Sequence, residues 1–72
     1  MKEIIEKAKK LGYTKGIKIK SLIGNTKGVI IGDPYLSPTQ NQYVKINVKT
    51  TFGEEMPFII YDGISNKWAD KL

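Results

Sequence analysis

Three residue types are missing from this chain, which has no cysteine, no histidine and no arginine. Without cysteine it can form neither a disulfide nor a thiolate metal site. Without histidine it lacks the commonest metal ligand and the commonest general base. Arginine most often reads guanine edges and phosphates, so its absence argues against base-specific recognition of nucleic acid. We therefore expect no enzyme activity, no metal site and no cofactor.

Long apolar runs are also missing. No segment approaches the roughly 18 consecutive apolar residues that a membrane-spanning helix needs. The N-terminal residues Met-Lys-Glu-Ile-Ile-Glu carry charges every few positions, which predicts that there is no signal peptide. The lack of cysteine fits a reducing compartment. We expect a cytoplasmic protein of a bacterial or virus-infected cell, with no membrane partner.

The 72 residues predict a single domain, 1–72,. A chain this short buries only about 60% of its unfolded surface, so self-association into a homodimer or larger oligomer is an expected source of stability. The net charge is +5, and all 12 basic residues are lysine. Residues 1–32 hold eight lysines and two glutamates, whereas residues 33–72 hold four lysines and five acidic residues. The basic character therefore belongs to the first half of the chain.

Residues 1–12 are predicted to contain a helix and its stop. Ile4, Ile5, Ala8 and Leu11 form one apolar stripe at helical spacing,. Gly12 then supplies a C-terminal stop. A helix of about ten residues is unstable alone, so its stripe must pack on the rest of the domain or on a partner.

The region 15–71 is predicted to form strands. From Gly16 onward apolar and polar residues alternate, and we expect five short strands at 17–20, 29–31, 43–51, 56–61 and 67–69,. Gly24, Gly28 and Gly32 are interpreted as turn and strand-end residues. Five short strands predict a closed antiparallel barrel, because an open sheet leaves its edges unprotected. The predicted core is Ile4, Ile5, Ala8, Leu11, Ile17, Ile19, Val29, Ile31, Val44, Ile46, Val48, Phe58, Ile60 and Trp68.

Two segments carry a resemblance to known proteins. Lys-Gly-Ile-Lys-Ile at 15–19, followed by Lys-Gly-Val-Ile-Ile-Gly at 27–32, resembles the opening of SH3-like barrels of the KOW and Tudor types. The resemblance extends over 15–68 and implies a five-stranded antiparallel SH3-like barrel that binds RNA, ribosomal or transcription components, or modified peptides. The ending Ile-Tyr-Asp-Gly at 60–63 and Lys-Trp-Ala at 67–69 is similar to that of small uncharacterised bacterial and phage proteins.

The first candidate site is a lysine-rich strand face. Lys18 and Lys20 project from one predicted strand, and Lys45, Asn47 and Lys49 project from another. If the two strands are neighbours, four ammonium groups share one surface and attract a phosphate backbone without reading its sequence. The competing interpretation is a solvated outer face, since lysine guards strands against edge pairing.

The second candidate is Tyr35, which lies in a proline-flanked segment, 33–41, that we predict to be a loop. Long loops often carry function, so we expect Tyr35 to be an exposed contact residue. Most of the other large aromatic residues, Phe58 and Trp68 above all, are expected in the core. The alternatives are that some of the aromatic set, which also includes Tyr13, Tyr43, Phe52 and Tyr61, stand exposed as stacking platforms for a single strand or line a groove for an extended peptide. Glu54, Glu55 and Asp62 are expected to be solvated turn charges.

Two functional hypotheses follow. In the first, the domain is a non-catalytic protein-binding module, such as an accessory or inhibitor protein of phage type, or one that binds its own copy. In the second, it binds nucleic acid non-specifically through the lysine face. A small-molecule site at a dimer interface is a third alternative.

Overall fold

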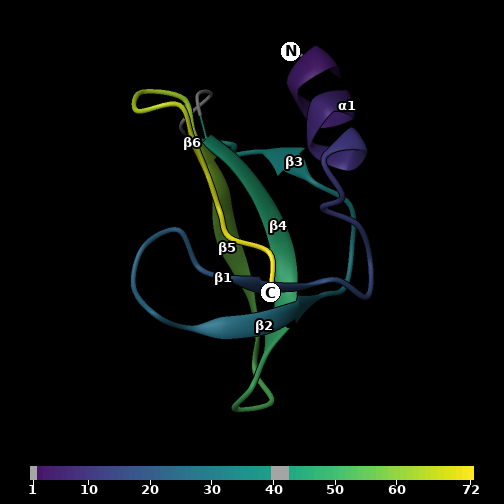
Figure 1. Ribbon diagram of the computed structural model, residues 1–72, viewed down its shortest axis with the longest axis vertical. Helices are drawn as coiled ribbons and strands as arrows, with labels where there is room; N and C mark the ends of the chain where they lie inside the picture. Colours follow the sequence, from purple (N-terminus) through teal and green to yellow (C-terminus); the bar gives the residue numbers. More distant parts are fainter. Residues whose placement is uncertain (1, 40–42) are drawn as a thin grey trace.

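The computed structural model describes residues 2–39 and 43–72, and it consists of one helix and six strands. The predicted loop 33–41 is therefore described up to residue 39, while positions 40 and 41 lie outside the described residues. The elements, in chain order, are α1 (Lys2–Lys10), β1 (Lys18–Lys20), β2 (Lys27–Ile30), β3 (Tyr35–Leu36), β4 (Tyr43–Thr50), β5 (Glu55–Asp62) and β6 (Lys67–Trp68). Figure 1 shows α1 at one end of the molecule and the strands below and beside it.

Helix α1 ends where the sequence predicts. The backbone N–H of Gly12 donates to the Lys9 carbonyl, and that of Tyr13 donates to the Ala8 carbonyl. Gly12 has a φ of +100°, so this pair of hydrogen bonds is a Schellman stop that requires a left-handed residue. Ala8 and Tyr13 are both buried, and they pack the end of the helix against the sheet.

The strands form one antiparallel sheet in the order β1-β2-β4-β5-β6, and β3 pairs with β4. Two strands share the edge of β4 that faces away from β5. Strand β2 pairs with Val48–Thr50, and β3 pairs with Val44 and Lys45. A register shift between Val44 and Lys45 marks a bulge where β4 passes β5. The prediction of a mostly β domain behind an N-terminal helix is confirmed.

The predicted five-stranded barrel differs from the structure in two ways. There are six strands, because Tyr35 and Leu36 pair with β4 inside the segment that we predicted to be a loop. The sheet is also not closed, since only a single isolated bridge, Ile19 to Lys71, joins β1 to the C-terminal residues. At this bridge the Lys20 N–H donates to the Asp70 carbonyl and the Leu72 N–H donates to the Lys18 carbonyl, both at 2.9 Å, and β6 itself pairs with β5 alone.

The core lies between α1 and the inner face of the sheet. Its buried apolar residues are Ala8, Tyr13, Ile19, Ile30, Val44, Ile46, Val48, Phe58, Ile60 and Ala69. Ile4, Ile5 and Trp68 pack against them while partly exposed. These positions confirm most of the predicted core, and Tyr13, Ile30 and Ala69 are buried residues that the predicted core did not include.

Two predicted core residues, Leu11 and Ile17, are exposed. Leu11 is 37% exposed because α1 ends at Lys10 and the chain turns there. Ile17 is 36% exposed, since it precedes β1 and its N–H donates to the Thr14 carbonyl in a turn.

We predicted the wrong side chains of β2 to point toward the core. Ile30 is buried, whereas Val29 and Ile31 are only half-buried. Three consecutive aliphatic residues carry no alternation, so the sequence does not indicate which face points inward. In the structure, Ile30 points toward the core and Val29 points away from it.

Candidate binding surface

The outer face of β1, β2 and β4 is built by side-chain alternation. Ile19, Gly28, Ile30 and Val48 point inward and are buried. Their neighbours along each strand therefore point outward, because successive side chains in a strand alternate between the two faces. The outward residues are Lys18 and Lys20 on β1, Lys27 and Val29 on β2, and Lys45, Asn47 and Lys49 on β4. We call this surface the outer face.

The strand register aligns Lys18, Val29 and Lys49 in one row. Lys18 is the partner of Val29 across β1 and β2, and Val29 is the partner of Lys49 across β2 and β4. Adjacent strands are about 4.8 Å apart, so the two lysines lie about 10 Å apart at their backbones, on either side of Val29. In the next row, Lys20 is directly opposite Lys27.

The predicted lysine face is therefore only partly correct. Strands β1 and β4 are not neighbours, because β2 lies between them. The structure brings Lys18 and Lys49 into one row but does not bring Lys45 to Lys18 or Lys20. It also adds Lys27, which we missed by starting the second strand at Val29. Extending the alternation two residues back from Val29 would have found it.

A shallow groove of about 280 Å³ opens on this face. It is lined by Lys18, Lys27, Gly28, Val29, Lys49, Thr50, Thr51 and Leu72. We call it the lysine groove. Lys18, Lys27 and Lys49 are exposed, and Val29 is half-buried between them. Leu72 is 61% exposed and adds a second aliphatic side chain. The groove thus combines ammonium groups with an aliphatic centre.

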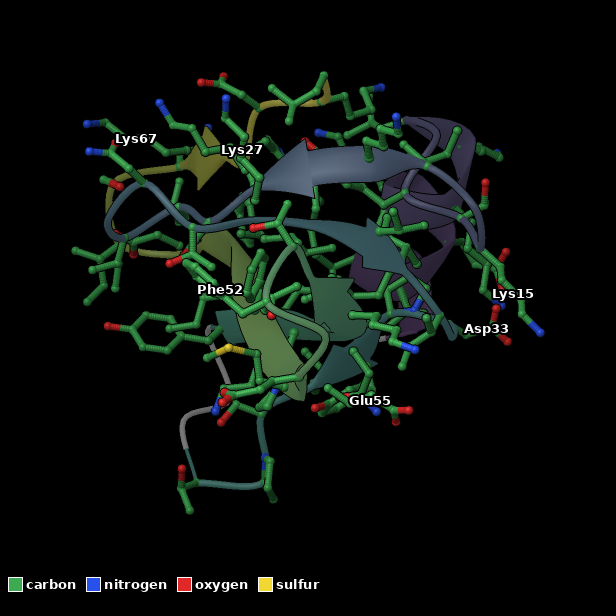
Figure 2. The ribbon with its side chains drawn as sticks, turned by 90° about the horizontal axis from the view of Figure 1, so that it is seen from below. Lys15, Lys27, Asp33, Phe52, Glu55 and Lys67 are labelled. Carbon is green, nitrogen blue, oxygen red and sulfur yellow. The ribbon has the colours of Figure 1, made fainter. Side chains whose placement is uncertain are left out.

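The ammonium groups of this face have no carboxylate partners within the described part of the chain. No ion pair joins Lys18, Lys20, Lys27 or Lys49 to another described residue. Lys49 has Glu55 as its register partner on β5, so the row that starts at Lys18 ends at an acidic residue. Figure 2 shows Lys27 on the side of the molecule that faces away from Lys15 and Asp33.

Tyr35 occupies a different position from the one that we predicted. It lies in β3, is half-buried, and is the register partner of Lys45. Its hydroxyl donates to the Asn47 side-chain oxygen at 3.0 Å. The segment is held down by the buried Ser37, whose backbone N–H donates to the Tyr43 carbonyl at 2.9 Å. Tyr35, Lys45 and Asn47 thus form a second cluster on the outer face, and the binding roles of all six predicted site residues stay predictions.

Three aromatic rings pack together where the end of α1 meets the C-terminal residues. The Trp68 ring stacks on Tyr13 at 5.5 Å between centroids and tilts against Tyr61 at 4.4 Å. The Tyr13 hydroxyl donates to the Ala69 carbonyl, and burial, followed by the charge of Asp70, raises the pKa of this hydroxyl. These contacts stabilise the core. The prediction that Phe58 is buried in the core is confirmed, whereas Trp68 packs against the core while half-buried.

Lys71 completes the same junction. Its ammonium group lies 5.2 Å from the centre of the Tyr13 ring and donates to the Leu11 carbonyl at the end of α1. A cation at a helix C-terminus is favourable because it faces the negative end of the helix dipole. Lys71 is therefore committed to the fold, unlike the lysines of the groove.

The acidic residues that the structure describes are spread over the molecule or used in turns. Among the residues that the structure describes, no three acidic side chains are grouped closely enough to hold a metal ion. Asp62 closes the β5–β6 turn, accepting hydrogen bonds from the Ser65 hydroxyl and the Ile64 N–H, both at 2.8 Å. The Ser65 hydrogen bond, followed by that of Ile64, lowers the pKa of Asp62.

Phe52 belongs to the aromatic residues that we expected mostly in the core, and the structure places it in solvent instead. It lies at the tip of the β4–β5 hairpin and is 80% exposed. Its neighbour Thr51 lines the lysine groove, so an aromatic ring is available beside that groove. Exposure of an aromatic at a hairpin tip has no local sequence signal beyond the turn itself.

No helix in residues 2–39 and 43–72 is long and apolar enough to span a membrane. Comparison of the chain with protein-family models, with curated proteins and with solved structures found no match.

Proposed function

We propose that this protein is a non-catalytic module that binds a protein partner through the outer face of its sheet. The observation that carries the proposal is the row Lys18–Val29–Lys49, which places an aliphatic side chain between two ammonium groups. Protein surfaces offer carboxylates and aliphatic groups at such spacings. The cluster of Tyr35, Lys45 and Asn47 extends the same face along β4 and supplies hydrogen-bonding groups for the rim of an interface.

The chemistry of the chain supports binding over catalysis. With no histidine or cysteine, the chain lacks the commonest general base and the thiol nucleophile, and a serine nucleophile would need activation by a lysine. The Ser21 hydroxyl donates to the Ile23 carbonyl, and the Ser65 hydroxyl donates to Asp62. Both hydroxyls are thus used within their own turns.

Three further expectations belong to the same proposal. We propose a cytoplasmic location and an SH3-like relationship for residues 15–68, although the sheet is open. We also propose that the partner is either another protein or a second copy of this chain. Among the residues that the structure describes, seven large apolar side chains are exposed, including Ile23, Phe52 and Ile64, and such residues contribute to protein interfaces.

Affinity capture from cells of the encoding organism tests the proposal. The tagged protein is compared with a double variant of the lysine groove, Lys18→Gln with Lys49→Gln. A matched control is Lys9→Gln with Lys15→Gln, which removes the same charge from exposed positions outside the groove. We expect one protein at constant ratio that survives nuclease treatment and is lost only from the groove variant. Equal recovery on both variants would contradict the proposal.

Non-specific binding of nucleic acid is the second candidate function. The observation that favours it is the set of four lysines on one face, Lys18, Lys20, Lys27 and Lys49, without ion pairs among the described residues. The exposed Phe52 ring next to the groove would supply a stacking platform for a base. If the three lysines that line the groove, Lys18, Lys27 and Lys49, each contact one phosphate, the affinity for a single strand should fall about 20-fold between 50 and 200 mM salt. In the affinity capture, loss of the co-purified partners after nuclease treatment would favour this function.

A further inference from the structure

The residues that line the lysine groove indicate the chemistry of its binding partner. We infer that it binds an acidic segment of a partner protein, which places an aliphatic side chain over Val29 and carboxylates beside Lys18 and Lys49. The inference rests on the proposed function and narrows it to one class of ligand. It is argued from the charge of the groove, its aliphatic centre and the acidic residue at one end.

The charge of the groove is unbalanced. Lys20 and Lys27 are register partners, and like charges directly opposite one another across two strands are unfavourable. Of this pair only Lys27 lines the groove, where it joins Lys18 and Lys49, and none of the four lysines forms an ion pair within the described residues. Carboxylates of a ligand would neutralise the three groove lysines, so the groove is complementary to a negatively charged segment.

The centre of the groove is aliphatic. Val29 lies between Lys18 and Lys49 in register, and Leu72 lines the same space. Apolar surface gains free energy when another apolar group covers it, whereas a phosphate or a sugar hydroxyl there would be desolvated without a partner. Among the described lining residues none is aromatic, so a base would find no ring to stack on over Val29 and would have to use Phe52 beside the groove,. The centre therefore favours a protein segment over a nucleic acid.

One end of the row restricts how an acidic segment can lie. Glu55 is the register partner of Lys49, so a carboxylate placed beyond Lys49 would meet a like charge. The segment should therefore lie over β1, β2 and β4 and stop before β5. In an extended peptide, every second side chain points the same way, about 7 Å apart. A Glu-Ser-Leu-Ser-Glu sequence presents two carboxylates around one leucine and matches the row, because lysine side chains are long and flexible.

The test uses the full chain, labelled with ¹⁵N, and three probes followed by backbone amide shifts. The first probe is the capped peptide Glu-Ser-Leu-Ser-Glu, the second is the same peptide with serine in place of leucine, and the third is a short oligothymidylate of equal charge. We expect the leucine peptide to shift the amides of β1, β2 and β4 around Val29 and to bind about fourfold more tightly than the serine peptide. That ratio corresponds to the burial of roughly one methylene group.

Three variants locate the interaction. Val29→Thr keeps the β-branched shape and should weaken the leucine peptide about fourfold, with no effect on the serine peptide. Lys49→Gln should weaken both peptides roughly two- to fivefold, as for one exposed ion pair. Glu55→Gln should strengthen both, because it removes a like charge. The amide spectrum outside the groove and the thermal midpoint of each variant verify that it remains folded.

The inference is overturned by any of three results. The oligothymidylate could shift the groove amides more than the leucine peptide does, with Phe52→Ala reducing its binding, which would assign the groove to nucleic acid. The two peptides could bind equally, which would leave Val29 without a role. Finally, millimolar leucine peptide could leave the groove amides unshifted. If that happens while affinity capture still yields a groove-dependent protein partner, the ligand chemistry is wrong and the proposed function stands.

Discussion

Adding a single methyl group at Gly28 should show whether glycine is required there by the close approach of two strands or by turn geometry. A Cβ at position 28 would lie 2.9 Å from the carbonyl oxygen of Lys49 and 3.2 Å from a methyl carbon of Val48. The oxygen belongs to the backbone of β4, which is held by β2 on one edge and by β5 on the other. It cannot move aside as the end of a flexible side chain can. Gly28→Ala must therefore push β2 away from β4.

The expected cost follows from two opposing terms. Overpacking in a tight interior costs about 1–3 kcal/mol, and replacing glycine by alanine stabilises the fold by about 0.4–1 kcal/mol through the unfolded chain. The net loss for Gly28→Ala is about 1–2 kcal/mol, or about 5–15 °C in the thermal midpoint of a domain of this size. Gly32 is the matched control, since a Cβ there meets no atom within 4 Å. Gly32→Ala should be neutral or stabilising by up to about 1 kcal/mol.

Urea unfolding, followed by the fluorescence of Trp68, measures both variants. Trp68 suits this purpose because its ring contacts Tyr13 and Tyr61 only in the folded chain. We expect the unfolding midpoint to fall for Gly28→Ala and to rise or stay constant for Gly32→Ala, with equal slopes. Equal midpoints for the two variants would refute the argument that strand approach, and not local turn geometry, requires glycine at position 28.

Two further predictions concern hydrogen-bonded titratable groups. Tyr13→Phe removes the buried hydrogen bond to the Ala69 carbonyl and should cost about 1–2 kcal/mol in urea unfolding. Because the pKa of Tyr13 is raised, the neutral hydroxyl favours the folded state: the advantage of the parent over Tyr13→Phe should be complete below about pH 10 and should shrink as the pH rises through the folded pKa. A constant difference up to pH 11 would argue against this cause. Asp62→Ala should lower the thermal midpoint by opening the β5–β6 turn. Since the pKa of Asp62 is lowered, that difference should be present above about pH 4 and should disappear as the pH falls through the lowered pKa, and Ser65→Ala, which removes the largest cause, should reproduce part of it. A midpoint difference that persists at pH 2 would count against the role of the carboxylate.

The elements that could be predicted from the sequence are those whose signals are local. The stop at Gly12 needs only a glycine after an amphipathic turn, and the structure has it with a φ of +100°. Strand β4 alternates cleanly from Tyr43 to Thr50, and its inward residues are buried as predicted. The helix and this strand therefore appear with nearly the predicted bounds, because the competing conformations would place apolar side chains in water.

The elements that could not be predicted depend on partners far along the chain. Strand β3 has only two residues, Tyr35 and Leu36, and it exists because the N-terminal half of β4 has a free edge beside it. Which side of β2 points toward the core depends on Gly28, because at that point the β4 backbone leaves no room for a Cβ. No local pattern in three successive aliphatic residues carries that information.

The sequence by itself determined the chemistry that this protein lacks, its surplus of lysine and its division into a short helix and a strand-rich remainder. It did so because composition and side-chain period are properties of the chain alone. Only the tertiary structure decided that Lys18 and Lys49 lie on either side of Val29, and that Lys27 joins them. Lys18 and Lys49 are 31 positions apart in the chain, and a slip of one residue in β2 would turn Val29 and Lys27 to the other face. The close approach of β2 to β4 at Gly28 prevents that slip.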